Sequence, residues 1–489
     1  MSRTPNIPGE RKERRRQIRP LAEGAFSRAA GAPLIGGNAV RLLLSPSENF
    51  TAWREAIRTA KKTVYFENYI FQTDDTGRAF RQELTERARA GVSVRVVLDW
   101  FGSLMTRRSF WEPLVKAGGS VRYHNPPSID SPLALMGRDH RKLVVVDGEV
   151  GYVSGVCVSS AWLGDPAKKI EEWRDTGIEL RGPAVTELAA AFASVWAQNG
   201  TPIPDGELAG STVPGVAGET AVRVIATAPD IAGLYRLDLL IAAIAQQRLW
   251  LTDAYFAGTS GYVQALRAAA RDGVDVRLLV PGGSDLPWLR PLTTAGYRPL
   301  LEAGVRVFEW NGSMLHAKTA VADDRWSRVG STNLNVMGWL TNYELDVAID
   351  DAEIARQMAD AYERDLEHAT EVVLQRKRRV RLPCPDDEGG RSRPGRGSLA
   401  RATAGALRIT RTVSAAMTNQ RVLDPAEARS IAFTATALLV LATLAILFPS
   451  IVAWPIAAVA FLTGIVLFMR AWRLRASGKG DGPDSDPPA

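Results

Sequence analysis

Cysteine and histidine are both scarce in this chain of 489 residues. Only two cysteines occur, Cys157 and Cys384, and they lie far apart in the sequence. So few cysteines exclude a disulfide framework and are typical of a reducing compartment. The chain also has no CxxC pair and no cluster of cysteines with histidines, so a structural zinc site is not expected.

The sequence shows no secretory signal and no excess of acidic residues. Its first twenty residues, MSRTPNIPGERKERRRQIRP, contain a basic stretch that no apolar run follows. The formal net charge of +7 fits an anionic partner, either membrane lipid or nucleic acid. Residues 1–35 are predicted to form a basic, disordered tail. The alternative is a polybasic strip that lies against anionic headgroups.

Charged residues are absent from Ile431 to Met469. As one helix this stretch would run about 58 Å, almost double the roughly 30 Å of a hydrocarbon core. Pro449-Ser450 offers a break, so the stretch predicts a two-helix transmembrane hairpin at 431–469. Basic residues on both flanks place both ends in the cytoplasm, together with the body of the chain. The alternative is a buried helical pair in a soluble core.

Two basic segments border this predicted hairpin. Residues 376–430 begin with Arg376-Lys377-Arg378-Arg379 and contain DDEGGRSRPGRG, so they are predicted to be a flexible linker held at the anionic membrane surface. Residues 470–489 are predicted to be a cytoplasmic tail that is basic at first and then disordered.

The body of the chain contains an internal repeat. AGVSVRVVLD at 90–99 matches DGVDVRLLVP at 272–281, KAGGSVRYHN at 116–125 matches EAGVRVFEWN at 302–311, and VYFENYIF matches LWLTDAYF. Apolar strands alternate with helical patterns such as Arg78–Ala90 and Gly261–Arg271, which indicates layered α/β units. We therefore expect two tandem α/β domains, at 36–200 and 218–375, with pseudo-twofold symmetry and one site at their seam.

Each repeat carries the same HxKxxxxD pattern. The first is HRKLVVVD from His140 through Lys142 to Asp147, and the second is HAKTAVAD from His316 through Lys318 to Asp323. Lysine and aspartate follow a histidine at these offsets by chance only roughly once in several hundred cases. Two satisfied core histidines are the alternative, which does not explain why both patterns fall in register with the repeat.

This spacing makes chemical sense on an extended chain. Residues i and i+2 of a strand point to the same face, so the histidine and the lysine of each motif project together. A seam that joins both motifs would hold two imidazoles and two ammonium groups, which is an anion site. There the lysines can bind phosphate oxygens, a neutral imidazole can attack phosphorus, and a protonated one can give its proton to the leaving alkoxide.

Polar residues after each motif extend this candidate site. Ser331 and Asn333 can donate hydrogen bonds to a phosphoryl oxygen. Glu344 follows the second motif and Asp175 the first, and a carboxylate behind a catalytic histidine fixes its tautomer. Surface charges on strands are the alternative interpretation of Asp175 and Glu344.

The paired HxKxxxxD motifs, with GSTN at 330–333, resemble the phospholipase D superfamily over roughly residues 36–374. GRDHRKLVVVDGEVGYVSG, EWRDTGIELRGPAV and MLHAKTAVADDRWSRVGSTNLN are similar to bacterial cardiolipin synthases in particular. The resemblance implies two α-β-α sandwich domains and a membrane enzyme that joins two phosphatidylglycerols, releases glycerol and passes through a phosphatidyl-histidine. It also implies no metal and no other cofactor, and the inner membrane of a bacterial cell as the location.

The resemblance also implies roles for single residues. His140 and His316 would be nucleophile and general acid, while Lys142, Lys318, Ser331 and Asn333 would bind phosphate. Asp175 and Glu344 would orient the imidazoles, and the motif residues Asp147 and Asp323 are expected to be structural rather than chemical.

The chain departs from the family pattern at two points. Cys157 stands where the first motif is usually followed by Asn, so phosphate stabilisation is expected to rest mainly on the second half. The predicted hairpin follows the catalytic body, whereas it often precedes that body in the family. A hydrolytic phospholipase D or a transphosphatidylase acting on other phospholipids stays open, since no residue distinguishes water from an alcohol acceptor. A nuclease is disfavoured because no basic patch with interleaved aromatic residues is present, so we expect no nucleic-acid partner.

Overall fold

The structure is a computed structural model that describes residues 23–127, 137–209, 214–229, 231–285, 290–374 and 420–422. The predicted hairpin at 431–469, the tail at 470–489 and most of the predicted linker lie outside these residues. None of the helices among these residues combines the length and the apolar character that a membrane span needs.

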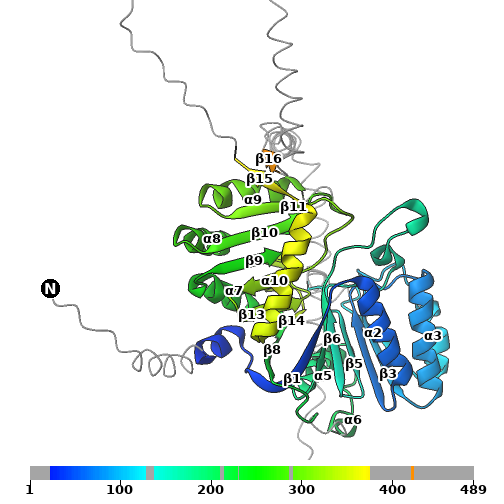
Figure 1. Ribbon diagram of the computed structural model, residues 1–489. Coiled ribbons are helices and arrows are strands. Elements are labelled where there is room, and N and C mark those ends of the chain that lie inside the picture. Colours follow the sequence, from blue (N-terminus) through cyan, green and yellow to red (C-terminus); the bar gives the residue numbers. More distant parts are fainter. Residues whose placement is uncertain are drawn as a thin grey trace, which may run out of the picture. The chain divides into compact units, whose positions relative to one another are not determined.

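The first half of the fold alternates strands with helices, as the sequence predicts (Figure 1). Asp74 caps the amino-terminal end of helix α3 (Asp75–Arg89), because its carboxylate accepts a hydrogen bond from the backbone N–H of Gly77. The strands are β1 (Ile35–Leu43), β2 (Thr63–Asn68), β3 (Ser93–Asp99), β4 (Ser120–His124), β5 (Leu143–Val146), β6 (Val150–Ser154) and β7 (Gly177–Arg181). The helices are α2 (Pro46–Thr59), α3 (Asp75–Arg89), α4 (Glu112–Lys116), α5 (Val185–Gln198) and α6 (Asp205–Ala209).

The second half repeats this order of elements. Its predicted helix at 261–271 is confirmed as α8 (Ser260–Arg271), in the place that α3 takes in the first half. The strands are β8 (Thr220–Thr227), β9 (Arg248–Thr252), β10 (Asp275–Pro281), β11 (Arg306–Trp310), β12 (Thr319–Ala322), β13 (Trp326–Gly330), β14 (Glu344–Asp350) and β15 (Ala369–Val373). The other helices are α7 (Gly233–Ile244), α9 (Arg290–Glu302) and α10 (Ala352–Glu367).

The described strands join into one sheet, and its two halves mirror each other in strand order. The order is β16-β15-β11-β10-β9-β12-β13-β14-β8-β1-β7-β6-β5-β2-β3-β4. In each half three strands run parallel, β2-β3-β4 and β9-β10-β11, and the strand that follows the histidine (β5 or β12) pairs antiparallel to the first of them. The histidines therefore lie at the carboxyl ends of β2 and β9. A short strand from the predicted linker, β16 (Gln420–Val422), pairs parallel to β15.

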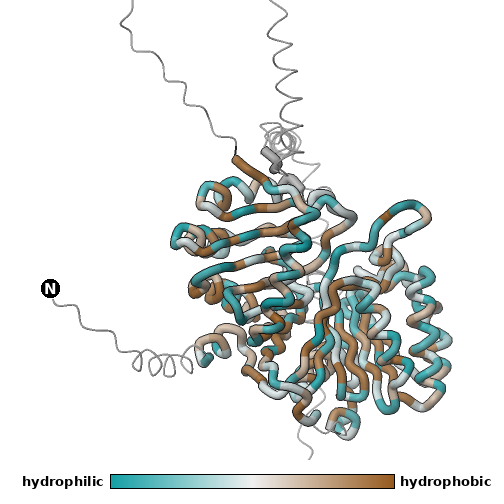
Figure 2. Tube along the Cα trace, viewed as in Figure 1, coloured by the Kyte–Doolittle hydropathy of each residue, from teal (hydrophilic) through white to brown (hydrophobic). Residues whose placement is uncertain are grey.

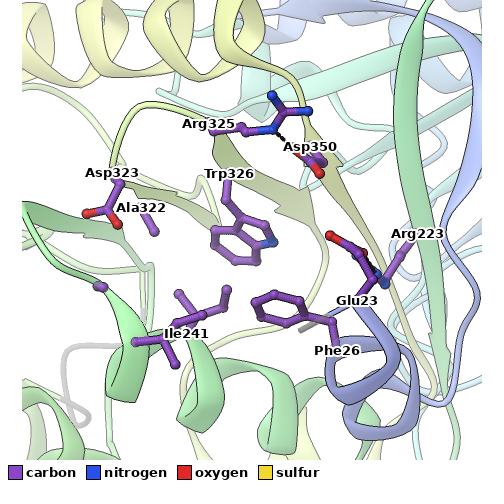
Figure 3. A pocket seen from close by; sticks show the side chains of 11 residues that line it. Glu23, Phe26, Arg223, Ile241, Ala322, Asp323, Arg325, Trp326 and Asp350 are labelled. Carbon is purple, nitrogen blue, oxygen red and sulfur yellow. Dashed lines mark hydrogen bonds and ion pairs between the residues drawn. The ribbon is translucent and has the colours of Figure 1, made fainter. Parts of the chain in front are cut away.

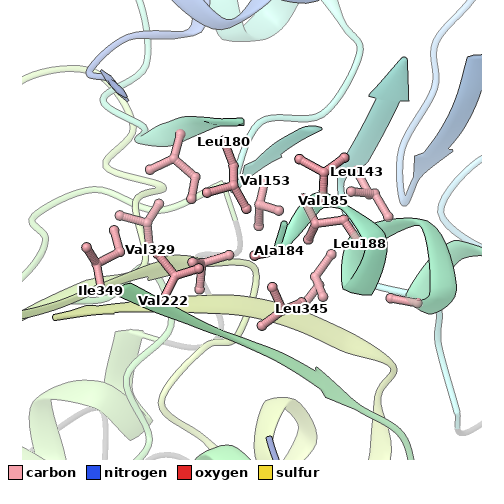
Figure 4. Close-up of a cluster of buried hydrophobic side chains, with 14 of the residues drawn as sticks. Leu143, Val153, Leu180, Ala184, Val185, Leu188, Val222, Val329, Leu345 and Ile349 are labelled. Carbon is pink, nitrogen blue, oxygen red and sulfur yellow. The ribbon is translucent and has the colours of Figure 1, made fainter. Parts of the chain in front are cut away.

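Each half is an α/β/α sandwich, and the two halves share their inner layer. The outer helices α2, α3 and α4 cover one face of the first half, and α7, α8 and α9 cover the corresponding face of the second. Helices α5 and α10 belong to a common apolar cluster with strands of both halves. Figure 4 shows residues of both halves in this cluster, among them Val153 and Leu180 of the first half and Val329 and Ile349 of the second. Figure 2 shows that apolar residues are concentrated in the strands, whereas polar residues predominate along α3.

Part of the predicted disordered tail at 1–35 is folded. Residues 23–30, placed by the sequence within a disordered tail at 1–35, are helical and pack on the second half, so that prediction is wrong for this stretch. Phe26 packs against the core of the second half and Ala30 is buried in it, because apolar residues recur at helical spacing. Arg236 fixes the segment by donating to the carbonyl of Ala29 at 3.0 Å.

This helical segment lines a cavity of about 220 Å³ (Figure 3). Phe26, Ile241 and Trp326 form its apolar part, and the ion pairs Glu23–Arg223 and Arg325–Asp350 border it. Asp323 also lines it, at the carboxyl end of β12. The cavity thus lies at the opposite end of β12 from the histidine of the second motif.

Candidate active site

The two histidines lie in extended segments that lead into β5 and β12, and each segment pairs with the other half of the molecule. The backbone N–H of His140 donates to the carbonyl of Tyr343 at 2.9 Å, and that of Tyr343 donates to Arg138 at 2.8 Å. Correspondingly, the N–H of His316 donates to the carbonyl of Arg174 at 2.7 Å. These bridges bring each histidine beside the carboxylate-bearing segment of the opposite half.

The histidine–carboxylate pairs therefore form crosswise between the halves. Nδ1 of His140 lies 3.0 Å from Oε2 of Glu344, and Nδ1 of His316 lies 2.8 Å from Oδ2 of Asp175. Both carboxylates are completely buried, which excludes the alternative that they are surface charges. Each of the two predicted catalytic histidines thus contacts one of the two carboxylates predicted to orient it.

The two carboxylates are held by different neighbours. Glu344 accepts from the hydroxyl of Ser331 at 2.5 Å and from the amide of Asn342 at 3.2 Å. Asp175 accepts from the backbone N–H of Thr176 at 2.8 Å and from the indole N–H of Trp162 at 3.3 Å. Gly155 occupies the position of Ser331 in the first half, and a Cβ there would lie 2.3 Å from Oδ1 of Asp175. Close approach to the carboxylate thus requires glycine at this point.

Both motif lysines are completely buried beside the histidines. Nζ of Lys142 donates to the carbonyl of His140 at 2.5 Å, and Nζ of Lys318 donates to the carbonyl of His316 and lies 3.0 Å from its Nδ1. Within the described part of the chain neither ammonium group forms a salt bridge with a carboxylate, so the site keeps positive charge for a further anion.

Burial and the lysines keep the imidazoles neutral. Burial, followed by the charge of Lys318, lowers the pKa of His316 to about 4, and burial also lowers the pKa of His140 against the pull of Glu344. Burial alone would raise the pKa of Asp175 and Glu344, but the facing histidines and lysines outweigh it and hold each carboxyl pKa below its ordinary value. An ionised carboxylate can only accept hydrogen bonds, so Nδ1 carries the proton and Nε2 keeps its lone pair.

The lowered pKa of Lys318, the lysine of the second motif, leads to a prediction of how turnover depends on pH. Burial lowers the pKa of Lys318 to about 8, so the free site loses a positive charge as the pH rises through this value. We expect kcat/KM to fall above about pH 8, because kcat/KM reports the free enzyme. A bound phosphodiester stabilises the ammonium form, so the fall in kcat should come at a higher pH. Profiles of both constants between pH 6 and about 10 check this, and coincident limbs would contradict it.

The residues predicted to bind phosphate are not placed alike. Asn333 is nearly buried, and its side-chain oxygen has no hydrogen-bond partner among the described residues. Ser331, by contrast, donates its hydroxyl proton to Glu344 and accepts from the N–H of Leu345 at 3.0 Å. Cys157, at the position of Asn333 in the first half, is buried, and burial raises the pKa of its thiol. Among the described residues no side-chain hydrogen bond holds the Asn333 amide, so its N–H groups, unlike the hydroxyl of Ser331, can donate to a phosphoryl oxygen.

The motif aspartates lie at the far ends of β5 and β12. Asp147 accepts from the backbone N–H groups of Lys61, Lys62 and Thr63, at 2.6–3.2 Å. Asp323 accepts in the same way from residues 246–248. Seven extended residues place each aspartate about 20 Å from its histidine. The structure thus does not bring Asp147 and Asp323 to the imidazoles.

This placement predicts that the motif aspartates contribute to stability. Asp147 has a φ of 57°, a left-handed conformation that alanine adopts at a cost. Asp147→Ala removes the acceptor for three N–H groups and adds this strain, so the free energy of unfolding should fall by about 2 kcal/mol. Turnover per folded molecule should change little. Urea unfolding and steady-state kinetics of the same preparation check both; a loss of turnover as large as that of a histidine variant would contradict the placement.

Several aromatic residues beside the histidines were not predicted. Tyr69 packs edge-on against His140, with ring centroids 4.8 Å apart, and lies 5.1 Å from Nζ of Lys142. Tyr255 takes the same position towards His316 and Lys318, at 5.9 and 5.7 Å. The matched segments VYFENYIF and LWLTDAYF each contain a tyrosine just after the strand, one position out of register, which is a weak signal for this pair. Trp162 and Trp173 also pack against His316, but the second half has no matching pair at this spacing.

A buried arginine locks the site together across the seam. Arg141, next to His140, donates to the carbonyls of Glu344 at 3.1 Å and Thr227 at 2.9 Å in the second half. It also donates to the carbonyl of Ala191 in α5 at 2.9 Å. Two of these three charge-assisted hydrogen bonds reach the second half, so the position of the first motif depends on that half.

This arrangement can transfer a group through phosphorus. It provides two neutral imidazoles with free Nε2 atoms, two ammonium groups and an amide around one point. A bound phosphate anion raises the pKa of both imidazoles, so one can take up the proton that a general acid needs. Among the described residues, no group of three or more His, Cys, Asp or Glu side chains is arranged to hold a metal ion.

Comparisons with known proteins find relatives that are similar in sequence and others that are similar in fold. The family model described as "Cardiolipin synthase, PLD-like domain" matches residues 53–196 and 240–366. Cardiolipin synthase 1 of Bacillus anthracis is 30% identical over 70% of this chain and 69% of its own, and a cardiolipin synthase of Staphylococcus aureus is 30% identical over 70% of each chain. The crystal structure of a phosphatidylserine synthase from Haemophilus influenzae has the same fold, with a TM-score of 0.57 at 16% identity over 72% of this chain and 92% of the other.

Proposed function

Because this chain belongs to the phospholipase D-like domain family of the cardiolipin synthases, we propose that it is a phosphatidyltransferase that joins two phosphatidylglycerols into cardiolipin and releases glycerol. The observation that carries this proposal is the crosswise pairing of two motif histidines with two buried carboxylates, beside two buried lysines. Such a site holds one phosphodiester between a nucleophile and an acid.

The first step forms a covalent intermediate. Nε2 of His140 attacks phosphorus, the bond from phosphorus to the glycerol oxygen breaks, and protonated His316 gives its proton to that oxygen. Glu344 stabilises the positive charge that develops on His140, and Asp175 supports His316 as acid. Lys142, Lys318 and Asn333 hold the phosphoryl oxygens.

The second step reverses the roles of acid and base. A hydroxyl of the second phosphatidylglycerol gives its proton to neutral His316 and attacks phosphorus, and the nitrogen–phosphorus bond to His140 breaks. The products are cardiolipin and the original enzyme. Water in place of the lipid hydroxyl would give phosphatidic acid instead, so the acceptor determines whether transfer or hydrolysis results.

The membrane location remains part of the proposal. The uncharged stretch at 431–469 would hold the chain in a bacterial inner membrane as a two-helix hairpin, with the catalytic halves facing the cytoplasm. Its basic flanks and the basic linker support this orientation.

Mass spectrometry of labelled lipids tests the function. Membranes that contain the full chain are incubated with phosphatidylglycerol carrying a labelled glycerol headgroup, and we expect cardiolipin and free labelled glycerol in equal amounts. Turnover should persist in excess chelator, because ammonium groups take the position of a cation at the phosphate. Phosphatidic acid as the main product would favour a hydrolase, and turnover that requires an added divalent ion would contradict the imidazole mechanism.

A further inference from the structure

Two exposed apolar segments, one from each half, flank the segment that carries His140. The first follows β3, and Met105 at its tip is 75% exposed. The second contains the π-helix η6 (Met337–Thr341) and the residue before it, Val336, which is 48% exposed. We call their exposed apolar side chains the apolar rim, which comprises Phe101, Leu104, Met105, Val336, Met337 and Leu340.

Hydrogen bonds attach both segments to the active site. Asp99 accepts from the N–H of Phe101 at 2.9 Å and from that of Asp139, next to His140, at 3.0 Å. The second segment continues to Tyr343, which pairs with Arg138 and His140 through its backbone. It also begins at the site, since the amide of Asn335 donates to the carbonyl of Tyr255 at 3.0 Å. The rim therefore borders the site from both halves.

The segments are anchored from inside, so their apolar residues face outward from a fixed backbone. Trp339 is completely buried and donates its indole N–H to Asp238 at 3.0 Å, while its neighbours Met337 and Leu340 are exposed. In the first segment the hydroxyl of Ser103, itself buried, donates to the carbonyl of Tyr69 at 3.0 Å. Exposed apolar side chains on rigid supports mark an interaction surface.

The charges around the rim indicate an anionic partner. Residues 334–343 contain no charged side chain, and Arg107 and Arg108 follow directly after the first segment. Both arginines are exposed, and neither has an ion pair within the part of the chain that the structure describes. Apolar side chains bordered by arginine are typical of surfaces that enter the headgroup layer of an anionic membrane.

We propose that the apolar rim inserts into the headgroup layer of an anionic bilayer and seats the active site directly on it. The proposal rests on the function proposed above, since a phosphodiester in a bilayer lies at headgroup depth and the histidines are almost buried. Insertion of the rim would bring that phosphodiester to the opening of the site without extracting the acyl chains into water.

A comparison of two substrates tests this role. The double variant Met105→Glu with Leu340→Glu is assayed as the full chain in detergent-free vesicles of dioleoylphosphatidylglycerol and phosphatidylcholine, and in solution with monomeric dihexanoyl phosphatidylglycerol. We expect a fall of roughly tenfold or more with vesicles, because two carboxylates oppose insertion, and less than about twofold with the monomeric lipid. An equal fall with both substrates, or no fall with vesicles, would overturn the proposal.

A matched control uses exposed apolar residues at the opposite end of the sheet. Val216 is 80% exposed beside Gly37, and Ile244 lies at the cavity of Figure 3. Val216→Glu with Ile244→Glu should leave both rates unchanged. If the unmodified chain turns over neither lipid, the proposed function fails, and the fluorescence experiment that follows still tests the rim.

Fluorescence measures insertion without catalysis. The predicted hairpin would hold every variant on vesicles, so sedimentation cannot report on the rim. Met105→Cys and Val216→Cys, each with Cys384→Ser, are labelled with an environment-sensitive nitrobenzoxadiazole. In the same vesicles, a blue shift and quenching by spin-labelled lipid are expected at position 105 and not at 216. A label at 105 that stays in water would overturn the proposal.

Discussion

His140→Ala and His316→Ala should each lower the turnover of phosphatidylglycerol by about 10⁴-fold or more, yet they should fail at different steps. Loss of His140 removes the nucleophile, so no covalent phosphatidyl-enzyme should form with any substrate. Loss of His316 removes the acid, so a nitrophenyl phosphodiester, whose leaving group needs no proton, should still label His140. Quenching with labelled substrate, followed by peptide mass spectrometry, locates the phosphorus.

The outcome distinguishes the two assignments. Label on His316 in the unmodified enzyme would reverse the roles of the two imidazoles. Label on neither residue, with turnover intact in both variants, would refute the histidine mechanism. His124→Ala is a suitable control, because that imidazole is buried beside Asn199 and touches none of the motif residues; it should leave labelling of folded protein unchanged.

Glu344→Gln and Asp175→Asn should also lose much of their turnover, by about 10²- to 10⁴-fold. Each amide keeps the shape of the side chain but removes the charge that stabilises the imidazolium and selects the Nδ1–H tautomer. Because Glu344 pairs with His140 across the seam, Glu344→Gln should slow formation of the phosphatidyl-histidine even with the nitrophenyl substrate. Asp175→Asn should spare that step and slow only reactions that need the acid. Rapid-quench kinetics with both substrates measure the difference.

The opposite pattern would mean that each histidine works with the carboxylate of its own half. Asp147→Asn provides the matched control, since it neutralises a motif carboxylate that lies at the far end of β5. This variant should keep the rate of labelling, with any loss confined to stability. Equal effects of all three substitutions would indicate a general response to charge rather than the crosswise pairs.

The sequence predicts the parts of this site better than their connections. Two HxKxxxxD motifs in register with a repeat locate both histidines and lysines, because the strand period places residues i and i+2 on one face. The carboxylates could be named but not paired, since Asp175 and Glu344 follow their own motifs at similar distances. The pairing depends on which face of each half packs against the other, and apolar patterns alone do not determine that.

Other misses have a similar cause. Ser331 has the chemistry of a phosphate donor, but its proton belongs to Glu344 once the second half folds. The helix at 23–30 was hidden by the basic residues before it, which dominate the composition of the tail. In the sequence, nothing distinguishes Arg141 from other charged residues. Its buried hydrogen bonds to Glu344 and Thr227 form only when the two halves pack together.

The crosswise pairing of histidines and carboxylates has a consequence for inheritance. After a gene duplication one copy can often accumulate substitutions freely. Here neither half contains a complete catalytic pair, because the histidine of each half pairs with the carboxylate of the other. One half alone therefore could not form such a pair; it would need a second half to supply the partner group. Cys157 stands where the second half has Asn333, so the two halves differ even inside the site, yet each still depends on the other for its histidine–carboxylate pair.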